Sequence, residues 1–133
     1  MDEHPPLTTE SIDALLQFLP IFEADEFVFG DWPPFDGGFP AFDFSDDAGQ
    51  FIDCLYHNNW VVPFDWPSWN EEAERLFNSP ELLERADLET LRKLLTLHVR
   101  RDRFCEGHLS EMFDTGHLTM ILERLRALRQ DLP

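Results

Sequence analysis

The chain has few basic residues, and they are unevenly distributed. Of its 133 residues, ten are Lys or Arg and 27 are Asp or Glu, so the formal net charge at pH 7 is −17. Residues 1–74 contain 17 acidic residues and no Lys or Arg, whereas residues 75–133 contain ten of each sign. Because proteins neutralise nucleic-acid phosphates with Lys and Arg, we expect no direct nucleic-acid binding. Three explanations of the acidic half stay open: a solvated surface, a docking face for a basic protein partner, and a decoy in which carboxylates imitate DNA phosphates.

The sequence also lacks membrane and export signals. No apolar run approaches the roughly 18 residues of a membrane-spanning helix, and the opening MDEHPP has no basic segment of a secretory signal. Cys54 and Cys105 are the only cysteines, too few for a disulfide scaffold. We therefore expect a cytoplasmic protein with reduced thiols, no membrane association and no cofactor.

The spacing of apolar residues predicts mostly helices. Residues suited to cap a helix precede several amphipathic stretches: Thr8 or Thr9, Ser45 or Asp46, and Asp87. The longest helix is expected over about residues 88–105. Gly107 and Gly116 then separate it from a short helix and from a last helix over about residues 117–130. Pro67 and Pro80 each fit the first turn of a shorter helix.

Strand signals are confined to the first half. Residues 26–30 and 41–45 flank a Pro/Gly-rich loop and predict a β-hairpin, and residues 60–62 predict a short third strand. The expected fold class is α+β, a mostly helical single domain with a small antiparallel hairpin or sheet in the N-terminal half. Residues 1–8 are expected to be a flexible leader and residues 9–133 a single globular domain.

The aromatic residues are concentrated early in the chain. Nine of the 13 Phe residues lie between Phe18 and Phe51, and their simplest role is a core between the sheet and the helices. The alternative is a ligand-stacking groove, for which the candidates are Phe35, Phe39, Trp32 and Trp66.

Chemically reactive residues gather between Thr96 and His117. On a helical wheel, His98 and Asp102 fall within the apolar arc of residues 88–105, and Cys105 falls at its edge. Residues four apart on a helix can meet, and burying unpaired polar groups costs roughly 1–3 kcal/mol each. Either His98 and Asp102 form a satisfied buried pair, or Asp102 orients His98 as a base in a cleft.

Catalytic and metal sites are the sharper alternatives for this segment. His98, Asp102, Cys105 and His108 are the catalytic candidates, with His108 close enough in sequence to activate the Cys105 thiol. His98, Cys105, His108 and His117 offer ligand types that zinc accepts, but their spacing matches no standard finger. We therefore predict no metal site and leave open whether the protein is an enzyme.

A non-catalytic ligand site is the leading prediction. A glycine break at Gly107 lets the next helix fold back across the end of the long one. The resulting cleft would be bordered by Arg100, Arg103, Glu106, His108 and His117. Arginine forks in such a cleft would bind an anionic small molecule. The alternative is that these five residues only cap and cross-link the three helices.

Several stretches resemble an uncharacterised family of small bacterial and archaeal domains. They are residues 12–16, 63–66, 86–100, 103–108, 112–113 and 116–117. The family is catalogued only as a domain of unknown function, and some relatives carry it behind an ADP-ribose-binding macrodomain. The resemblance implies an accessory role near ADP-ribose chemistry. The sequence thus predicts a non-enzymatic binding or accessory module. A small metal-dependent or His/Asp-based hydrolase and an acidic decoy that binds a basic protein are the alternatives.

Overall fold

The computed structural model describes residues 5–32 and 42–132. Its helices are α1 (Thr9–Leu16), α2 (Leu19–Glu23), α3 (Asp46–His57), α4 (Asn70–Asn78), α5 (Pro80–Leu83), α6 (Leu88–Asp102), α7 (His108–Asp114) and α8 (His117–Gln130), and a 3₁₀ turn, η1 (Trp66–Trp69), precedes α4. Strands β1 (Gly30–Asp31) and β2 (Asp43–Phe44) pair antiparallel, with Gly30 opposite Phe44. This confirms the α+β class, a mostly helical fold with a small antiparallel sheet in the N-terminal half.

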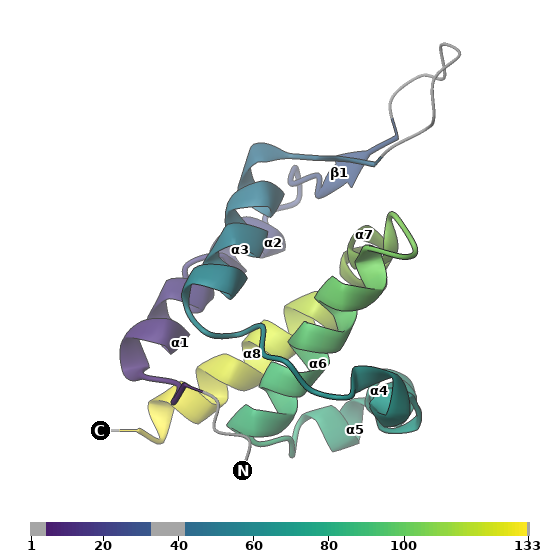
Figure 1. Ribbon diagram of the computed structural model, residues 1–133. Coiled ribbons are helices and arrows are strands. Elements are labelled where there is room, and N and C mark those ends of the chain that lie inside the picture. The colour runs from purple at the N-terminus through teal and green to yellow at the C-terminus, as the bar shows by residue number, and fades with distance from the viewer. Residues whose placement is uncertain (1–4, 33–41, 133) are drawn as a thin grey trace.

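Helix α8 lies at the centre of the arrangement. It contacts α1, α2, α5, α6 and α7, and Figure 1 shows α6 and α8 crossing the middle of the molecule, with the β1–β2 sheet at the end where α7 lies. The buried face of α8 follows the helical repeat, with Leu118, Ile121, Leu122 and Leu125 fully enclosed. Within the described residues, no helix is long and apolar enough to cross a membrane.

Local signals place the helix starts. The side chains of Thr8, Ser45 and Asp87 each accept a hydrogen bond from a backbone N–H in the first turn of α1, α3 and α6, as the sequence predicts. Pro20 stands in the first turn of α2, after α1 has ended at Leu16. These caps satisfy backbone donors that would otherwise lack partners.

The early phenylalanines form the core near the sheet. Phe22 packs edge-on against Phe51 and Phe113, with ring centroids 4.9 Å and 5.4 Å away, and Phe29 stacks on Phe113 at 5.5 Å. Each edge-to-face or stacked pair contributes about 0.5–1.5 kcal/mol beyond its buried area. The core prediction therefore holds for these residues. Phe35 and Phe39, proposed from the sequence for a ligand groove, lie outside the described residues.

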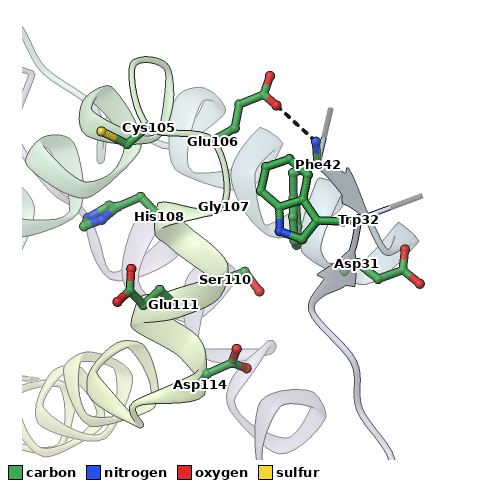
Figure 2. Close-up of a pocket in the computed structure, with 11 residues that line it drawn as sticks. Asp31, Trp32, Phe42, Cys105, Glu106, Gly107, His108, Ser110, Glu111 and Asp114 are labelled. Carbon is green, nitrogen blue, oxygen red and sulfur yellow. Dashed lines mark hydrogen bonds between the residues drawn. The ribbon is translucent and has the colours of Figure 1, made fainter. Parts of the chain in front are cut away.

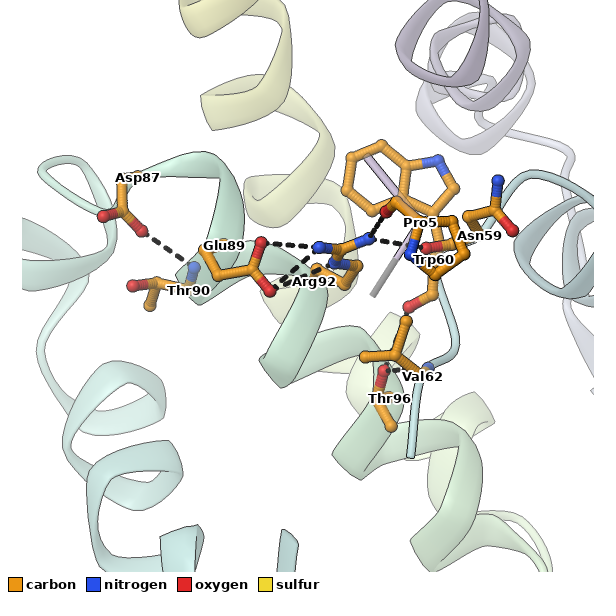
Figure 3. Close-up of polar contacts among 9 residues, drawn as sticks. All are labelled: Pro5, Asn59, Trp60, Val62, Asp87, Glu89, Thr90, Arg92 and Thr96. Carbon is orange, nitrogen blue, oxygen red and sulfur yellow. Dashed lines mark hydrogen bonds and ion pairs between the residues drawn. The ribbon is translucent and has the colours of Figure 1, made fainter. Parts of the chain in front are cut away.

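The third strand expected at residues 60–62 is not formed. The Val62 N–H donates to the Thr96 hydroxyl oxygen at 3.2 Å, and that hydroxyl donates to the Trp60 carbonyl at 3.0 Å. A buried threonine of α6 thus supplies the partners that a neighbouring strand would have given (Figure 3). The residue types of this segment correctly indicate burial, since Trp60 and Val62 are enclosed. They do not lead to strand pairing, because the backbone bonds to a helix side chain instead.

Arg92 anchors the N-terminal segment to α6. The residue is 4% exposed. Its guanidinium pairs with Glu89 at 2.7 Å and donates to the carbonyls of Pro5 at 2.6 Å and Asn59 at 3.3 Å (Figure 3). Leu7 packs against the core. Residues 5–8, assigned to the leader from the sequence, are therefore attached to the helical body.

Candidate functional site

Two glycine turns bring three histidines together. Gly107 and Gly116 have φ of 89° and 86°, a left-handed conformation that favours glycine, and each is followed by the first residue of a helix, His108 of α7 and His117 of α8. Both rings meet His98 of α6. The prediction that Gly107 folds the next helix back is therefore correct. The repeated Gly-His pair, nine residues apart, was the sequence signal that could have identified the cluster.

The three imidazoles form a hydrogen-bonded chain. His98 Nδ1 lies 3.0 Å from His108 Nε2, and His98 Nε2 lies 3.2 Å from His117 Nε2. A neutral imidazole has one N–H donor and one acceptor nitrogen, so the chain is satisfied when all three rings are neutral and donate in the same direction. His98 is therefore held through both of its ring nitrogens.

Burial keeps these rings neutral. The pKa of His98 lies well below its ordinary value of 6.5, chiefly because the ring is buried, and the nearby His117, His108 and Arg101 lower it further. Burial also lowers the pKa of His108 and of His117 to about 4. The cluster is uncharged at neutral pH.

The expected direct pair of His98 and Asp102 is not formed. Asp102 is half-buried and accepts a hydrogen bond from the Leu109 N–H at 2.9 Å, while His98 bonds to the other two histidines. Burial raises the pKa of Asp102, and the Leu109 N–H partly offsets that effect. Asp102 thus satisfies a backbone donor in the first turn of α7, which is the role of a helix cap.

The weak metal candidates do not converge on one point. His98 turns its two nitrogens to different neighbours, and Cys105 is exposed. In residues 5–32 and 42–132, no group of three or more His, Cys, Asp or Glu side chains is placed to hold a metal ion. The histidine chain is instead a network of neutral hydrogen bonds.

A cavity of about 610 Å³ lies between the β1–β2 sheet and the α6–α7 turn. Its lining comes from both sides, as Figure 2 shows: Gly30, Asp31, Trp32, Phe42, Cys105, Glu106, Gly107, His108, Ser110, Glu111 and Asp114. Of the five residues predicted to border a cleft, Glu106 and His108 line it. Arg100, Arg103 and His117 lie outside the lining.

Two contacts fasten the walls of this cavity to each other. The Phe42 N–H donates to Glu106 Oε2 at 3.1 Å, and the Trp32 indole lies over Gly107, where an added Cβ would come within 3.0 Å of the ring. Gly30 permits the hairpin itself, since a Cβ there would lie 2.4 Å from the Asp43 carbonyl oxygen. The cavity thus depends on glycine at two positions that side chains could not occupy without displacement.

The sequence predicts only part of the lining of this cavity. Trp32 had been named as a groove candidate, but Asp31, Phe42, Ser110, Glu111 and Asp114 had not. Trp66, the other aromatic candidate, lies beside the exposed Phe104, with ring centroids 6.1 Å apart, and does not line this cavity. Nothing in the local pattern of residues 30–44 shows that the hairpin would close on a turn more than 60 residues away.

A model of a family of unknown function, DUF6508, matches residues 7–131, and the chain belongs to that family. No curated protein and no solved structure matches the chain.

Proposed function

We propose that this protein is a non-enzymatic binding or accessory module whose site is the cavity between the β1–β2 sheet and the α6–α7 turn. The observation that supports this role most is the closure of that cavity by segments far apart in sequence, through the Glu106–Phe42 hydrogen bond and the contact of Trp32 with Gly107. A volume of about 610 Å³ lies within the range of small-molecule sites. Walls that are fixed before binding reduce the entropy cost of association.

The placement of the catalytic candidates supports binding over hydrolysis. His98 is 2% exposed and is held by two histidines, so its ring does not reach a ligand in the cavity. Nε2 of His108 faces His98, and within the described residues no hydrogen bond joins His108 to the Cys105 thiol. A nucleophile needs an adjacent base within hydrogen-bonding reach, and these side chains do not form such a pair.

An anionic ligand such as ADP-ribose is a further candidate, and its binding can be tested separately. Arg100 and Arg103, the predicted anion-binding forks, lie outside the cavity lining. An ADP-ribose complex would therefore have to use a surface beside the cavity. Binding of ADP-ribose that is lost when Arg103 is replaced would support this candidate.

A basic protein partner is a second candidate function. Among described acidic residues of the first 74, Asp13 and Glu72 form ion pairs, each with an arginine from the second half. Asp43, Asp46 and Asp53 are exposed on β2 and α3 without such a pair. Neutralising these three aspartates should weaken capture of a basic partner at low salt, and unchanged capture would count against a docking face.

A screen of chemically diverse fragments tests the proposed module. Ligands that bind the cavity should raise the melting temperature, since a ligand at a hundredfold its Kd stabilises the folded state by about 2.7 kcal/mol. Ser110→Tyr and the rim variant Asp114→Tyr should abolish these shifts by filling the cavity, whereas Asp53→Tyr on α3 should preserve them. Fragments that bind all three variants equally, or a screen without binders, would contradict the proposal.

A further inference from the structure

The cavity has a strongly acidic lining. Asp31 of β1, Glu106 of the α6–α7 turn, and Glu111 and Asp114 of α7 contribute four carboxyl groups, and the lining contains no Lys or Arg. His108 adds no positive charge at neutral pH because burial lowers its pKa to about 4. Walls of one sign concentrate ligands of the opposite sign. The lining therefore favours a cation and disfavours phosphate or carboxylate ligands.

A second feature of the cavity is the hydroxyl of a largely buried serine, which opens into the cavity. Ser110 is 9% exposed, and no residue within 5–32 or 42–132 forms a hydrogen bond with its side chain. Figure 2 shows this hydroxyl directed from α7 toward the hairpin wall, on the same side of the helix as Asp114 four residues later. No buried side-chain N or O atom of the described residues lacks a hydrogen-bond partner, so the Ser110 oxygen is accessible from the cavity. A serine oxygen accepts hydrogen bonds from N–H donors. The cavity thus offers an acceptor next to its negative charge.

An aromatic wall faces these polar groups. Trp32 is 51% exposed, and its ring meets the Phe42 ring edge-on, with ring centroids 5.4 Å apart. Its contact with Gly107 fixes the indole beside α7. Cations bind to aromatic faces within about 6 Å of the ring centre, and tryptophan is the strongest such partner.

Resting on the binding role proposed above, we propose that the cavity binds an organic cation with N–H donors, a guanidinium or primary ammonium group on a hydrocarbon arm. Asp114 and the other carboxylates attract the charge, the Ser110 hydroxyl accepts an N–H bond, and the Trp32 indole covers the flat or hydrocarbon part of the ligand. A metal cation fits less well, because within the described residues no three side chains of the required types converge on one point.

This chemistry has two natural sources. A free polyamine or guanidine would enter the cavity whole, whereas an arginine or lysine side chain would enter from a basic protein. Agmatine, which carries a guanidinium and an ammonium group on a short chain, represents the free ligand, and an arginine-rich peptide represents the second source. Tighter binding of the peptide than of agmatine, with the same dependence on the cavity residues, would identify the protein source.

Calorimetric titration of the full chain tests the inference. Agmatine should bind, tetramethylammonium should bind more weakly because it lacks N–H donors, and ADP-ribose should not bind the cavity. Asp114→Asn and Ser110→Ala should each weaken agmatine binding, by about tenfold for the loss of the charged partner, while their melting temperatures stay close to that of the parent chain. Asp25→Asn, an exposed aspartate in the turn after α2 and outside the cavity, is the matched control and should leave the affinity unchanged.

The outcomes separate this inference from the proposed module. If neutral or anionic fragments occupy the cavity and Asp114→Tyr blocks them while agmatine does not bind, the module stands and the cation assignment is overturned. If agmatine binds with equal affinity to the parent, Asp114→Asn, Ser110→Ala and Ser110→Tyr, it binds elsewhere and the inference fails. If neither agmatine nor any fragment binds, both fail.

Discussion

Helix α6 buries an arginine in its first half and a histidine in its second half, and these two side chains differ in character. Arg92 is 4% exposed, carries a permanent charge, and is held by Glu89 and by the carbonyls of Pro5 and Asn59. His98 is 2% exposed, is uncharged at neutral pH, and bonds only to two other imidazoles. The first group is charged and fixed by acceptors, while the second depends on all its members remaining neutral.

The two ends of α6 therefore differ in their response to pH: the end with Arg92 is insensitive, and the end with His98 is proton-sensitive. Arginine is always charged in proteins, so the Arg92 network is insensitive to ordinary changes of pH. Histidine changes charge near physiological pH unless its surroundings prevent it. Because His108 belongs both to the histidine chain and to the cavity lining, the proton-sensitive end is also the end that carries the candidate site.

The largest expected effect is the loss of stability in mild acid. The folded protein keeps His98, His108 and His117 neutral, with pKa values of about 4 for the last two, whereas the unfolded chain takes up protons below pH 6.5. The free energy of unfolding should therefore fall as pH drops from about 6.5 toward about 4, where the folded histidines also begin to protonate. Urea titrations should show that the free energy of unfolding falls by on the order of 3–5 kcal/mol between pH 7 and pH 5. The contribution of His108, which lines the cavity, should be the smaller part because water screens it.

A double variant isolates the histidines from the carboxylates. His108→Gln combined with His117→Gln removes two of the three buried groups, so stability should depend on pH less steeply over the same interval. The raised pKa of Asp102 acts in the opposite direction, and the lowered pKa of Asp87 acts at lower pH. An unchanged slope in the double variant would show that the histidine chain does not govern the acid response.

The next largest effect is expected at the permanently charged end. Arg92→Ala should lower the free energy of unfolding by about 3 kcal/mol, because it leaves Glu89 unpaired and two carbonyls without their donor. The loss should be nearly the same at pH 7 and pH 5, unlike the histidine effect. Arg92→Lys, which keeps the charge but not the planar fork, should recover part of the stability. Chemical unfolding at both pH values measures this, and a strongly pH-dependent loss would break the comparison.

A smaller effect should come from the threonine between the two ends. Thr96→Val keeps the shape but leaves the Val62 N–H and the Trp60 carbonyl without their shared partner, which should cost about 1–3 kcal/mol. Thr96→Ser retains the hydroxyl and should lose less. Hydrogen exchange at Val62 should accelerate in the valine variant alone. Equal exchange in both variants would contradict the role given to the hydroxyl.

The smallest effect is expected at Asp102. Asp102→Asn keeps an oxygen that can accept from the Leu109 N–H, so the change should cost less than about 1 kcal/mol, whereas Asp102→Ala should cost about 1 kcal/mol as for a lost helix cap. Thermal unfolding of the two variants makes the comparison. If Asp102→Asn were as damaging as removal of a histidine from the chain, Asp102 would belong to the proton-sensitive network.

Local features of the fold were predictable from the sequence, and long-range ones were not. The caps Thr8, Ser45 and Asp87 each act within three residues, so nearby residues suffice to find them. The burial of His98 followed from its position on an apolar arc, but its partners depend on how α7 and α8 cross α6. The wheel therefore suggested Asp102, four residues away on the same helix, where the structure has His108 and His117.

The cavity required tertiary information for the same reason. The sequence identifies the segment from Thr96 to His117 as a site region because its reactive residues are close together along the chain. Its second wall, Asp31, Trp32 and Phe42, becomes part of the site only because Glu106 holds the Phe42 N–H and Gly107 accommodates the indole. The charge of the site could not be predicted for the same reason. The arginines near Gly107 indicated an anion site, but the residues that line the cavity are acidic.

The most direct test of the central claim is an NMR titration of the isotopically labelled protein with agmatine. Binding in the cavity should shift the Trp32 indole N–H and the backbone amides of Ser110 and Glu111. The amides of Leu83 and Ala127, which line a separate groove formed by α5 and α8, should remain in place. Shifts confined to that groove, or no shifts at the Trp32 indole and Ser110 under conditions that saturate binding, would contradict the account.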